Sequence, residues 1–161
     1  RDQITPFYPA PKPRSYIGWG KSHALGTGLG LIMGAKVAAP EKFCVNFMGD
    51  AAFGMAGLDF ETSVRCNIPI TTIVFNNYTM AIETHHMKLS NEKYRTRDTS
   101  GDYAAMGKAM GGNSEKIEDP DEIIGALKRA KEMNEKGKSV LLEFITNEEI
   151  DYSHHMTFGY P

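Results

Sequence analysis

Cysteine is scarce in this sequence, and its placement excludes several classes of protein. There are two cysteines among 161 residues, Cys44 and Cys66, both in apolar surroundings and without C-x-x-C spacing. A disulfide framework is therefore not indicated, and we expect two buried thiols in a reducing, cytoplasmic compartment. Long apolar runs are also missing, because the longest uncharged stretches contain Pro69 and the pair Asn76–Asn77 or are rich in glycine. We expect no membrane-spanning segment.

Positive charge is in short supply as well. Eighteen Lys and Arg side chains stand against twenty Asp and Glu, which gives a formal net charge of −2. Without a basic excess to follow a phosphate backbone, we expect no nucleic-acid partner. Hydrophobic residues make up 41% and charged residues 24% of the chain, a composition that is typical of a globular domain and excludes general disorder.

Prolines are concentrated at the beginning of the chain. Four of the eight fall in one short stretch, as Pro6, Pro9, Pro11 and Pro13. Because proline fixes φ and lacks a backbone donor, residues 1–20 are predicted to form an extended linker. We expect one compact domain over residues 21–146 and a tail over residues 147–161. The proline-rich start leads us to expect a piece of a longer polypeptide.

The rest of the sequence alternates between two patterns. Apolar residues at helical spacing predict helices, and short apolar or β-branched runs predict strands buried on both faces. The predicted helices span residues 22–37, 57–66, 102–110 and 121–135, and the predicted strands span residues 42–48, 70–75 and 140–145. Strands that alternate with helices predict an α/β fold with three layers, α/β/α, around a central, mainly parallel sheet.

Candidate site residues follow two of the predicted strands. Asp50 comes directly after Gly49, and Asn77 lies 27 positions later, after the next strand. The carboxyl ends of parallel strands meet at one edge of a sheet, where ligands bind. Carboxylate and amide oxygens suit Mg²⁺ together with phosphate oxygens, and the small residues Ala51 and Ala52 let backbone amides approach a diphosphate. A simpler interpretation, in which these residues only form turns, stays open.

These residues resemble a known family signature. Gly49-Asp50-Ala51, followed at this distance by Asn76-Asn77, resembles the diphosphate and metal signature of thiamine-diphosphate-dependent enzymes, which in most members begins Gly-Asp-Gly. Residues 25–36 and 102–109 also resemble segments of that family, and the resemblance extends from about residue 16 to residue 145. It corresponds to the C-terminal, diphosphate-binding domain of the branch that includes acetolactate synthase, 2-oxoacid decarboxylases and oxalyl-CoA decarboxylase.

The resemblance implies a role for each matching residue. The metal Mg²⁺ would be held by Asp50, the side chain of Asn77 and the carbonyl of Thr79. Thiamine diphosphate would be contacted by the residues around them, which are His23, Leu25, Gly49, Ala51, Ala52, Ala81 and Ile82. Among these, Leu25 would lie beneath the cofactor, and the backbone of His23 would bind its aminopyrimidine ring. Ala51 and Ala52 replace the common glycine and serine, which implies that one hydrogen bond to the diphosphate is missing.

Glu83 and the histidines near it are further candidates. Glu83 lies where some 2-oxoacid decarboxylases of the family carry an active-site acid, and we name it as the candidate catalytic residue for proton transfer. The alternative is an exposed glutamate that the dipole of a helix favours. His85 and His86 are more simply explained by packing or exposure. His154 and His155 would either cover the site or lie in a frayed terminus.

A row of glycines also needs an interpretation. Gly26, Gly28, Gly30 and Gly34 suggest a dinucleotide-binding loop, but no buried strand is predicted before them. Close packing against the cofactor or against a partner helix explains the row better.

The function implied by the resemblance is that of a domain that anchors the diphosphate and Mg²⁺. It would belong to a lyase, decarboxylase or carboligase acting on small 2-oxoacid or acyl-CoA-type substrates. In this family the glutamate that activates the cofactor belongs to a pyrimidine-binding domain of the same or another subunit, so we expect this chain to be inactive alone and to form a homo-oligomer. Two alternatives stay open, a non-catalytic binding module with this fold and the small subunit of a two-subunit decarboxylase.

Overall fold

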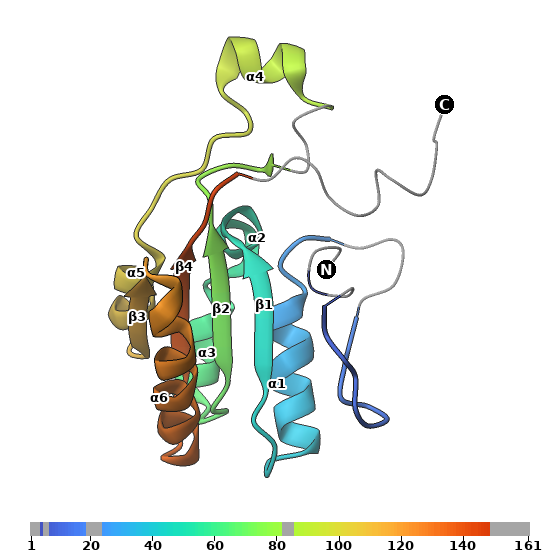
Figure 1. The fold of residues 1–161 in the computed structure, drawn as a ribbon, viewed down its shortest axis with the longest axis vertical. Helices are drawn as coiled ribbons and strands as arrows, with labels where there is room; N and C mark the ends of the chain where they lie inside the picture. The colour runs from blue at the N-terminus through green and yellow to red at the C-terminus, as the bar shows by residue number, and fades with distance from the viewer. Residues whose placement is uncertain (1–3, 5–6, 19–23, 82–85, 149–161) are drawn as a thin grey trace.

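A four-stranded parallel sheet forms the centre of this computed structural model, which describes residues 4, 7–18, 24–81 and 86–148. In spatial order the strands are β1 (Val45–Gly49), β2 (Thr71–Asn76), β4 (Val140–Ile145) and β3 (Asn113–Ile117). Each strand runs parallel to its neighbours. The carboxyl ends of the strands therefore lie at the same edge of the sheet (Figure 1).

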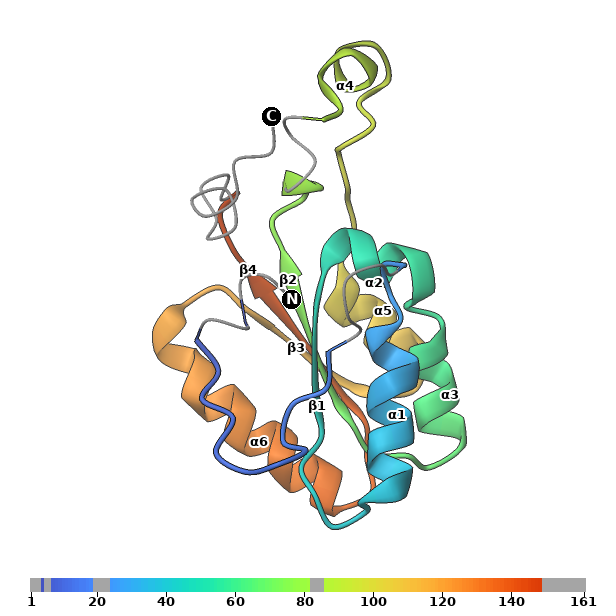
Figure 2. The ribbon, with the colours of Figure 1, turned by 90° about the vertical axis from the view of Figure 1, so that its right-hand side faces the viewer.

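Helices cover both faces of the sheet. One face carries α1 (Gly28–Ala38), α2 (Asp50–Ala56), α3 (Asp59–Arg65) and α5 (Tyr103–Ala109). The other carries α6 (Ile123–Glu135), preceded by the short 3-10 helix η2 (Pro120–Glu122). Figure 2 shows the resulting layers edge-on, which confirms the predicted α/β/α fold. Helix α4 (Lys88–Tyr94) lies apart from these layers, beyond the carboxyl ends of the strands.

Each face of the sheet has its own apolar core. The core under α1, α2, α3 and α5 includes Leu29, Phe53, Phe60, Val74 and Leu141. The core under α6 includes Ile73, Ile117, Ala126, Ala130 and Leu142. The central strands β2 and β4 contribute to both cores and are buried along almost their whole length. Burial on both faces explains why the two strands appear in the sequence as nearly continuous apolar runs.

Several element boundaries differ from the prediction. Helix α1 begins at Gly28 instead of residue 22, and β1 begins at Val45 instead of residue 42. The helix predicted over residues 57–66 is α3, and a separate helix, α2, precedes it. The chain turns between them at Gly57, where an added Cβ would lie 2.5 Å from the carbonyl oxygen of Phe53. Strand β3 and helix α4 were not predicted.

The two cysteines lie in different environments. Cys44 is buried, and burial raises the pKa of its thiol. Cys66 is exposed at the end of α3, with its sulfur 3.8 Å from Nη1 of Arg65. The prediction of two buried thiols is therefore wrong for Cys66, because the helix ends before that side chain reaches the core. Within the described ranges, every helix is too short or too polar to cross a bilayer.

Candidate functional site

The sheet brings Asp50 and Asn77 to the same edge. Gly49 and Phe75 are register partners at the ends of β1 and β2. Asp50 is the first residue of α2 and follows β1 without an intervening loop, while Asn77 directly follows β2. The two residues that the sequence singled out therefore follow β1 and β2, adjacent parallel strands whose carboxyl ends lie side by side in Figure 1.

The carboxylate of Asp50 is buried and held in place by neutral donors. The residue is 3% exposed. Its Oδ1 accepts a hydrogen bond from the Ala51 amide at 2.7 Å, and its Oδ2 accepts one from Oγ1 of Thr99, also at 2.7 Å. Neutral donors orient a carboxylate without cancelling its charge, and a cation is the partner that such a buried charge favours.

The loop after β2 is shaped by two successive asparagines. Oδ1 of Asn76 accepts a hydrogen bond from the amide of Tyr78, and Oδ1 of Asn77 accepts one from the amide of Thr79, each at 3.1 Å. Tyr78 has a φ of 60°, in the left-handed region that non-glycine residues adopt rarely. The side chains of the two asparagines thus fix a tight turn that a plain loop would not hold.

Residues 97–99 form a second segment that holds this loop in place through backbone hydrogen bonds. Thr79 forms an isolated antiparallel bridge with Asp98, where the Met80 amide donates to the carbonyl of Arg97 at 2.8 Å and the Thr99 amide donates to the carbonyl of Tyr78 at 3.0 Å. The Thr99 hydroxyl also donates a hydrogen bond to Asp50. Thr99 therefore joins the loop after β2 to the start of α2.

Tyr103 completes the surroundings of Asp50 from α5. Its ring packs edge-on against Phe53 of α2, with centroids 5.6 Å apart. Burial raises the pKa of the Tyr103 hydroxyl, and the negative charge of Asp50 raises it further, while a hydrogen bond with Thr99 opposes the shift. The phenol therefore stays neutral beside the carboxylate at physiological pH.

The donor set fits a hard cation and a diphosphate. A buried carboxylate, a side-chain amide oxygen and a backbone carbonyl are the oxygen ligands that Mg²⁺ takes in proteins. Oγ1 of Thr79 is buried and has no hydrogen-bond partner among the described residues, so the site holds a polar atom that a ligand would satisfy. A Cβ built on Gly49 would meet nothing within 4 Å, which leaves space beside the start of α2. No cluster of three or more His, Cys, Asp and Glu side chains that could hold a metal exists among the described residues.

The other predicted site residues fall into two groups. Leu25 is half-buried and packs against the core under α1, and Ala81 is half-buried at the end of the loop after β2. His86 is exposed. The remaining candidates lie outside the described residues, namely His23, Ile82, Glu83, His85, His154 and His155. Their roles stay predictions.

Two residues of the site were missed by sequence reasoning. Thr99 contacts Asp50 from 49 positions away, and Glu143 contacts Asn76 from 67 positions away. Neither belongs to a recognisable motif, so no local pattern marks them. One signal was available for Glu143, because it is the single charged residue in an otherwise apolar predicted strand.

The glycine row divides into two halves. A Cβ on Gly26 would lie 2.5 Å from Cβ of Ala56, and one on Gly28 would lie 2.5 Å from Oδ1 of Asn46. These two glycines therefore allow α1 to pack against α2 and β1. Gly30 and Gly34 meet nothing within 4 Å.

Comparison with known proteins points to one family. The family model described as "Thiamine pyrophosphate enzyme, C-terminal TPP binding domain" matches residues 3–144. A sulfoacetaldehyde acetyltransferase of Castellaniella defragrans is 32% identical over 149 residues, covering 86% of this chain and 24% of that protein. A probable acetolactate synthase of Mycobacterium bovis is 31% identical over 125 residues, covering 73% of this chain and 22% of that protein. The chain thus spans about a quarter of the length of these relatives.

A solved structure shares the fold. The thiamine diphosphate-dependent 4-hydroxybenzoylformate decarboxylase of Rhodococcus jostii superposes with a TM-score of 0.68 at 22% identity, covering 79% of this chain and 24% of that one. At this identity the likeness shows the fold alone.

Proposed function

The chain belongs to the thiamine pyrophosphate enzymes, as their C-terminal TPP-binding domain, and on that premise we propose that it anchors the diphosphate and Mg²⁺ of thiamine diphosphate. The observation that carries the proposal is the placement of Asp50 and Asn77 at adjacent strand ends, within a set of oxygen donors suited to Mg²⁺. The catalytic class that we propose is a lyase, decarboxylase or carboligase acting on 2-oxoacid or acyl-CoA-type substrates.

Each residue of the site has a defined task in this proposal. Asp50 supplies the anionic ligand to Mg²⁺, and Asn77 and the carbonyl of Thr79 supply neutral oxygens. The backbone at Ala51 and Ala52, in the first turn of α2, faces the diphosphate, where the helix dipole favours negative charge. Thiamine diphosphate supplies, when bound, a nucleophilic carbon that also accepts electrons from the substrate. Glu83 is proposed as the proton-transfer residue.

A second domain is needed in this proposal. The relatives are about four times as long as this chain, which leaves room for a pyrimidine-binding domain in the same or another subunit. We place that domain over the open edge of the site, where it would supply the glutamate that activates the cofactor. The chain is then inactive alone, and its working form is a homo-oligomer that takes a small-molecule substrate.

Substitution of Asp50 tests the proposal. Calorimetry on the complete protein, with Mg²⁺ and thiamine diphosphate as the probes, should show that Asp50→Ala abolishes metal-dependent binding, because the only anionic ligand of the proposed metal site is lost. Asp59→Ala is the matched control, since Asp59 is an exposed aspartate in the first turn of the neighbouring α3, and its affinity should equal that of the wild type.

Two results would contradict the assignment. Unchanged affinity in Asp50→Ala would remove Asp50 from the metal site. A wild-type protein that binds neither probe would favour the alternative of a non-catalytic module with this fold.

A further inference from the structure

Glu143 is a fully buried acidic residue that the proposed function does not use. It lies in the central strand β4 between Leu142 and Phe144 and has no exposed surface. Moving a carboxylate from water into such a core is costly unless hydrogen bonds and a nearby positive charge compensate for the lost hydration. The hydrogen-bond partners of Glu143 therefore indicate which role a glutamate has at this position.

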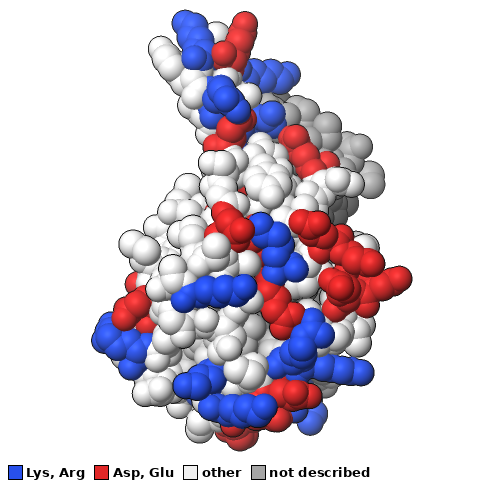
Figure 3. Space-filling view, turned by 90° about the vertical axis from the view of Figure 1, so that its left-hand side faces the viewer, with Lys and Arg blue, Asp and Glu red and all other residues white. Residues whose placement is uncertain are grey.

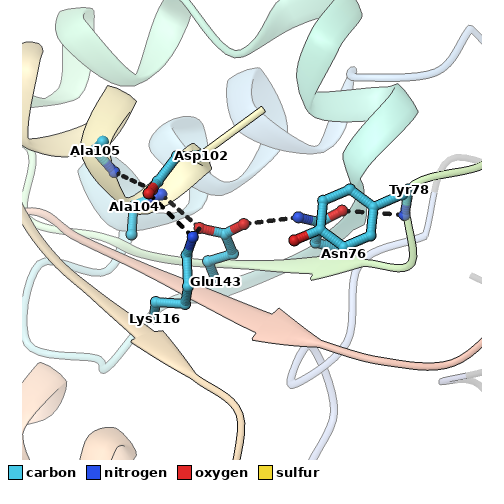
Figure 4. Close-up of polar contacts among 7 residues, drawn as sticks. All are labelled: Asn76, Tyr78, Asp102, Ala104, Ala105, Lys116 and Glu143. Carbon is cyan, nitrogen blue, oxygen red and sulfur yellow. Dashed lines mark hydrogen bonds and ion pairs between the residues drawn. The ribbon is translucent and has the colours of Figure 1, made fainter. Parts of the chain in front are cut away.

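Both oxygens of this carboxylate are engaged (Figure 4). Oε1 accepts a hydrogen bond from Nδ2 of Asn76 at 2.7 Å, and Oε2 accepts one from the amide of Ala104 at 2.8 Å. Nζ of Lys116 lies 3.8 Å from Oε2. Glu143 thus connects the end of β2, the first turn of α5 and strand β3.

The positive charge of Lys116 is itself held in position. Its Nζ is 3.0 Å from Oδ2 of Asp102, whose Oδ1 caps α5 by accepting from the amide of Ala105 at 2.7 Å. The hydrogen bonds from Ala105 and Lys116 lower the pKa of Asp102, and the hydrogen bond to Asp102 raises the pKa of Lys116. Both groups therefore stay charged at neutral pH.

The contact with Asn76 extends from Glu143 towards the proposed metal site. Asn76 is fully buried, and its amide is used at both ends, with Nδ2 on Glu143 and Oδ1 on the amide of Tyr78. This arrangement fixes the orientation of the amide, because a flip would place its NH₂ group against the Tyr78 amide and its oxygen against the Glu143 carboxylate. The next residues of the same turn are Asn77 and Thr79, which the proposed function places on the metal.

We propose that Glu143 is a positioning residue for the Mg²⁺ site. It holds Asn76 in the orientation that forms the turn, and the turn presents Asn77 and the carbonyl of Thr79 to the cation. This inference rests on the proposed function, because it assigns Glu143 a task at that same site.

The first test is Glu143→Gln in the complete protein. Glutamine keeps the shape of glutamate, but its NH₂ group would face either Nδ2 of Asn76 or the amide of Ala104 and would lose that hydrogen bond. Substitution of a residue in the outer shell of a metal site typically lowers metal affinity by about 10–100-fold. We therefore expect the Mg²⁺ concentration that half-saturates thiamine diphosphate binding, measured by calorimetry, to rise by at least about 10-fold.

Glu115→Gln is the matched control. Glu115 lies on the neighbouring strand β3, and its carboxylate pairs at 3.0 Å with Nε of Arg129 in α6, the helix on the other face of the sheet from α5. The same chemical change there should leave the Mg²⁺ dependence of thiamine diphosphate binding at its wild-type value.

A donor–acceptor exchange makes the test specific. In Asn76→Asp with Glu143→Gln, the glutamine NH₂ can donate to one oxygen of the aspartate, while the other oxygen still accepts from Tyr78 and the glutamine oxygen still accepts from Ala104. We expect this double variant to recover the Mg²⁺ dependence to within about 3-fold of the wild type. The reason is that residues 76 and 143 again form a hydrogen bond with each other and accept those from the amides of Tyr78 and Ala104. If Glu143→Gln does not fold, the double variant carries the test alone.

The outcomes separate this inference from the proposed function. A folded Glu143→Gln protein with wild-type Mg²⁺ dependence would overturn the positioning role and leave the proposed function intact. A folded double variant without metal-dependent binding would do the same. Failure of the wild type to bind Mg²⁺ and thiamine diphosphate would overturn both.

Discussion

Thr71 and Thr72 are neighbours in β2, and both are fully buried. Oγ1 of Thr71 donates to Oδ1 of Asn134 in α6 at 2.9 Å, whereas Oγ1 of Thr72 has no hydrogen-bond partner in the described part of the chain. The same side chain therefore contributes differently at two adjacent positions, because successive residues of a strand face opposite sides of the sheet.

Valine substitutions at these two positions should change stability in opposite directions. Thr72→Val removes this buried hydroxyl group, whose lost hydration no hydrogen bond replaces, and we expect the free energy of unfolding to rise by about 1 kcal/mol. Thr71→Val leaves the Asn134 oxygen without this donor and should lower stability by about 1–3 kcal/mol. Thermal melting of the complete protein measures both, and equal shifts in the two variants would contradict the prediction.

Single residues could be predicted only as far as local sequence carries their role. Asp50 and Asn77 were predicted because each directly follows an apolar strand in the sequence. The strand before each residue therefore shows that it lies at the carboxyl edge of the sheet. Thr99 and Glu143 act through partners that are distant in the sequence. The lone charge in an apolar run singles out Glu143 without revealing its partner, and nothing near Thr99 indicates its contact. Asp50 and Asn77 could therefore be predicted from the sequence, whereas Thr99 and Glu143, which hold the site in place, could not.

At the scale of elements, the buried strands and the long helix were predictable. Strands β2 and β4 are mostly apolar or β-branched, and α6 follows the Asp119-Pro120 signal with Asp119 accepting from the amide of Asp121 at 2.9 Å. Strand β3 (NSEKI) was missed because it is a polar edge strand in which only two residues, Ser114 and Ile117, are buried. Helix α4 was missed because none of its residues is buried, and so it lacks an apolar stripe.

The junction between α1 and α2 provides a prediction at this scale. Gly26 has a φ of 93°, and an added Cβ would lie 2.5 Å from Cβ of Ala56 and 3.1 Å from the carbonyl oxygen of Ala52. Gly26→Ala should therefore lower stability by at least about 2 kcal/mol, since backbone strain and overlap act together.

Gly54→Ala is the control for Gly26→Ala. Gly54 lies inside α2, and an added Cβ there would meet no described atom within 4 Å. Alanine should raise stability there by about 0.5–1 kcal/mol through its higher helix propensity. Denaturant unfolding of the two variants gives the comparison, and a Gly26→Ala protein as stable as the wild type would show that the junction tolerates a side chain.

At the scale of the whole molecule, the two sides of the domain differ in character. The side away from α1 carries acidic and basic side chains interspersed (Figure 3). The ion pairs of β3 with α6 and with the start of α5 are Arg129–Glu115 and Lys116–Asp102. Helix α1 (GLGLIMGAKVA) is apolar around almost its whole circumference, yet only Leu29 and Lys36 are buried. A helix that is hydrophobic on all sides is normally covered.

The exposed part of α1 is suited to another helix. Leu31 is 41% exposed and Val37 is 66% exposed. Gly30 and Gly34 lie one helical turn apart with open space beside them, which allows a close approach of a second backbone. Closed two-fold assemblies are the commonest way to bury such a surface, and we propose a second copy of the complete protein as its occupant.

Leu31→Glu in the complete protein tests this surface. A carboxylate placed in an apolar contact costs roughly 2 kcal/mol or more, so the dissociation constant of the assembly should rise by at least about 30-fold. Ile124→Glu is the matched control, because Ile124 is 62% exposed on α6, across the sheet from α1, and the same charge there should leave association unchanged. Sedimentation equilibrium over a range of concentrations measures both constants. Equal association in the two variants, or a wild type that is monomeric while it is fully active, would show that α1 is not the contact and that some other element covers its apolar face.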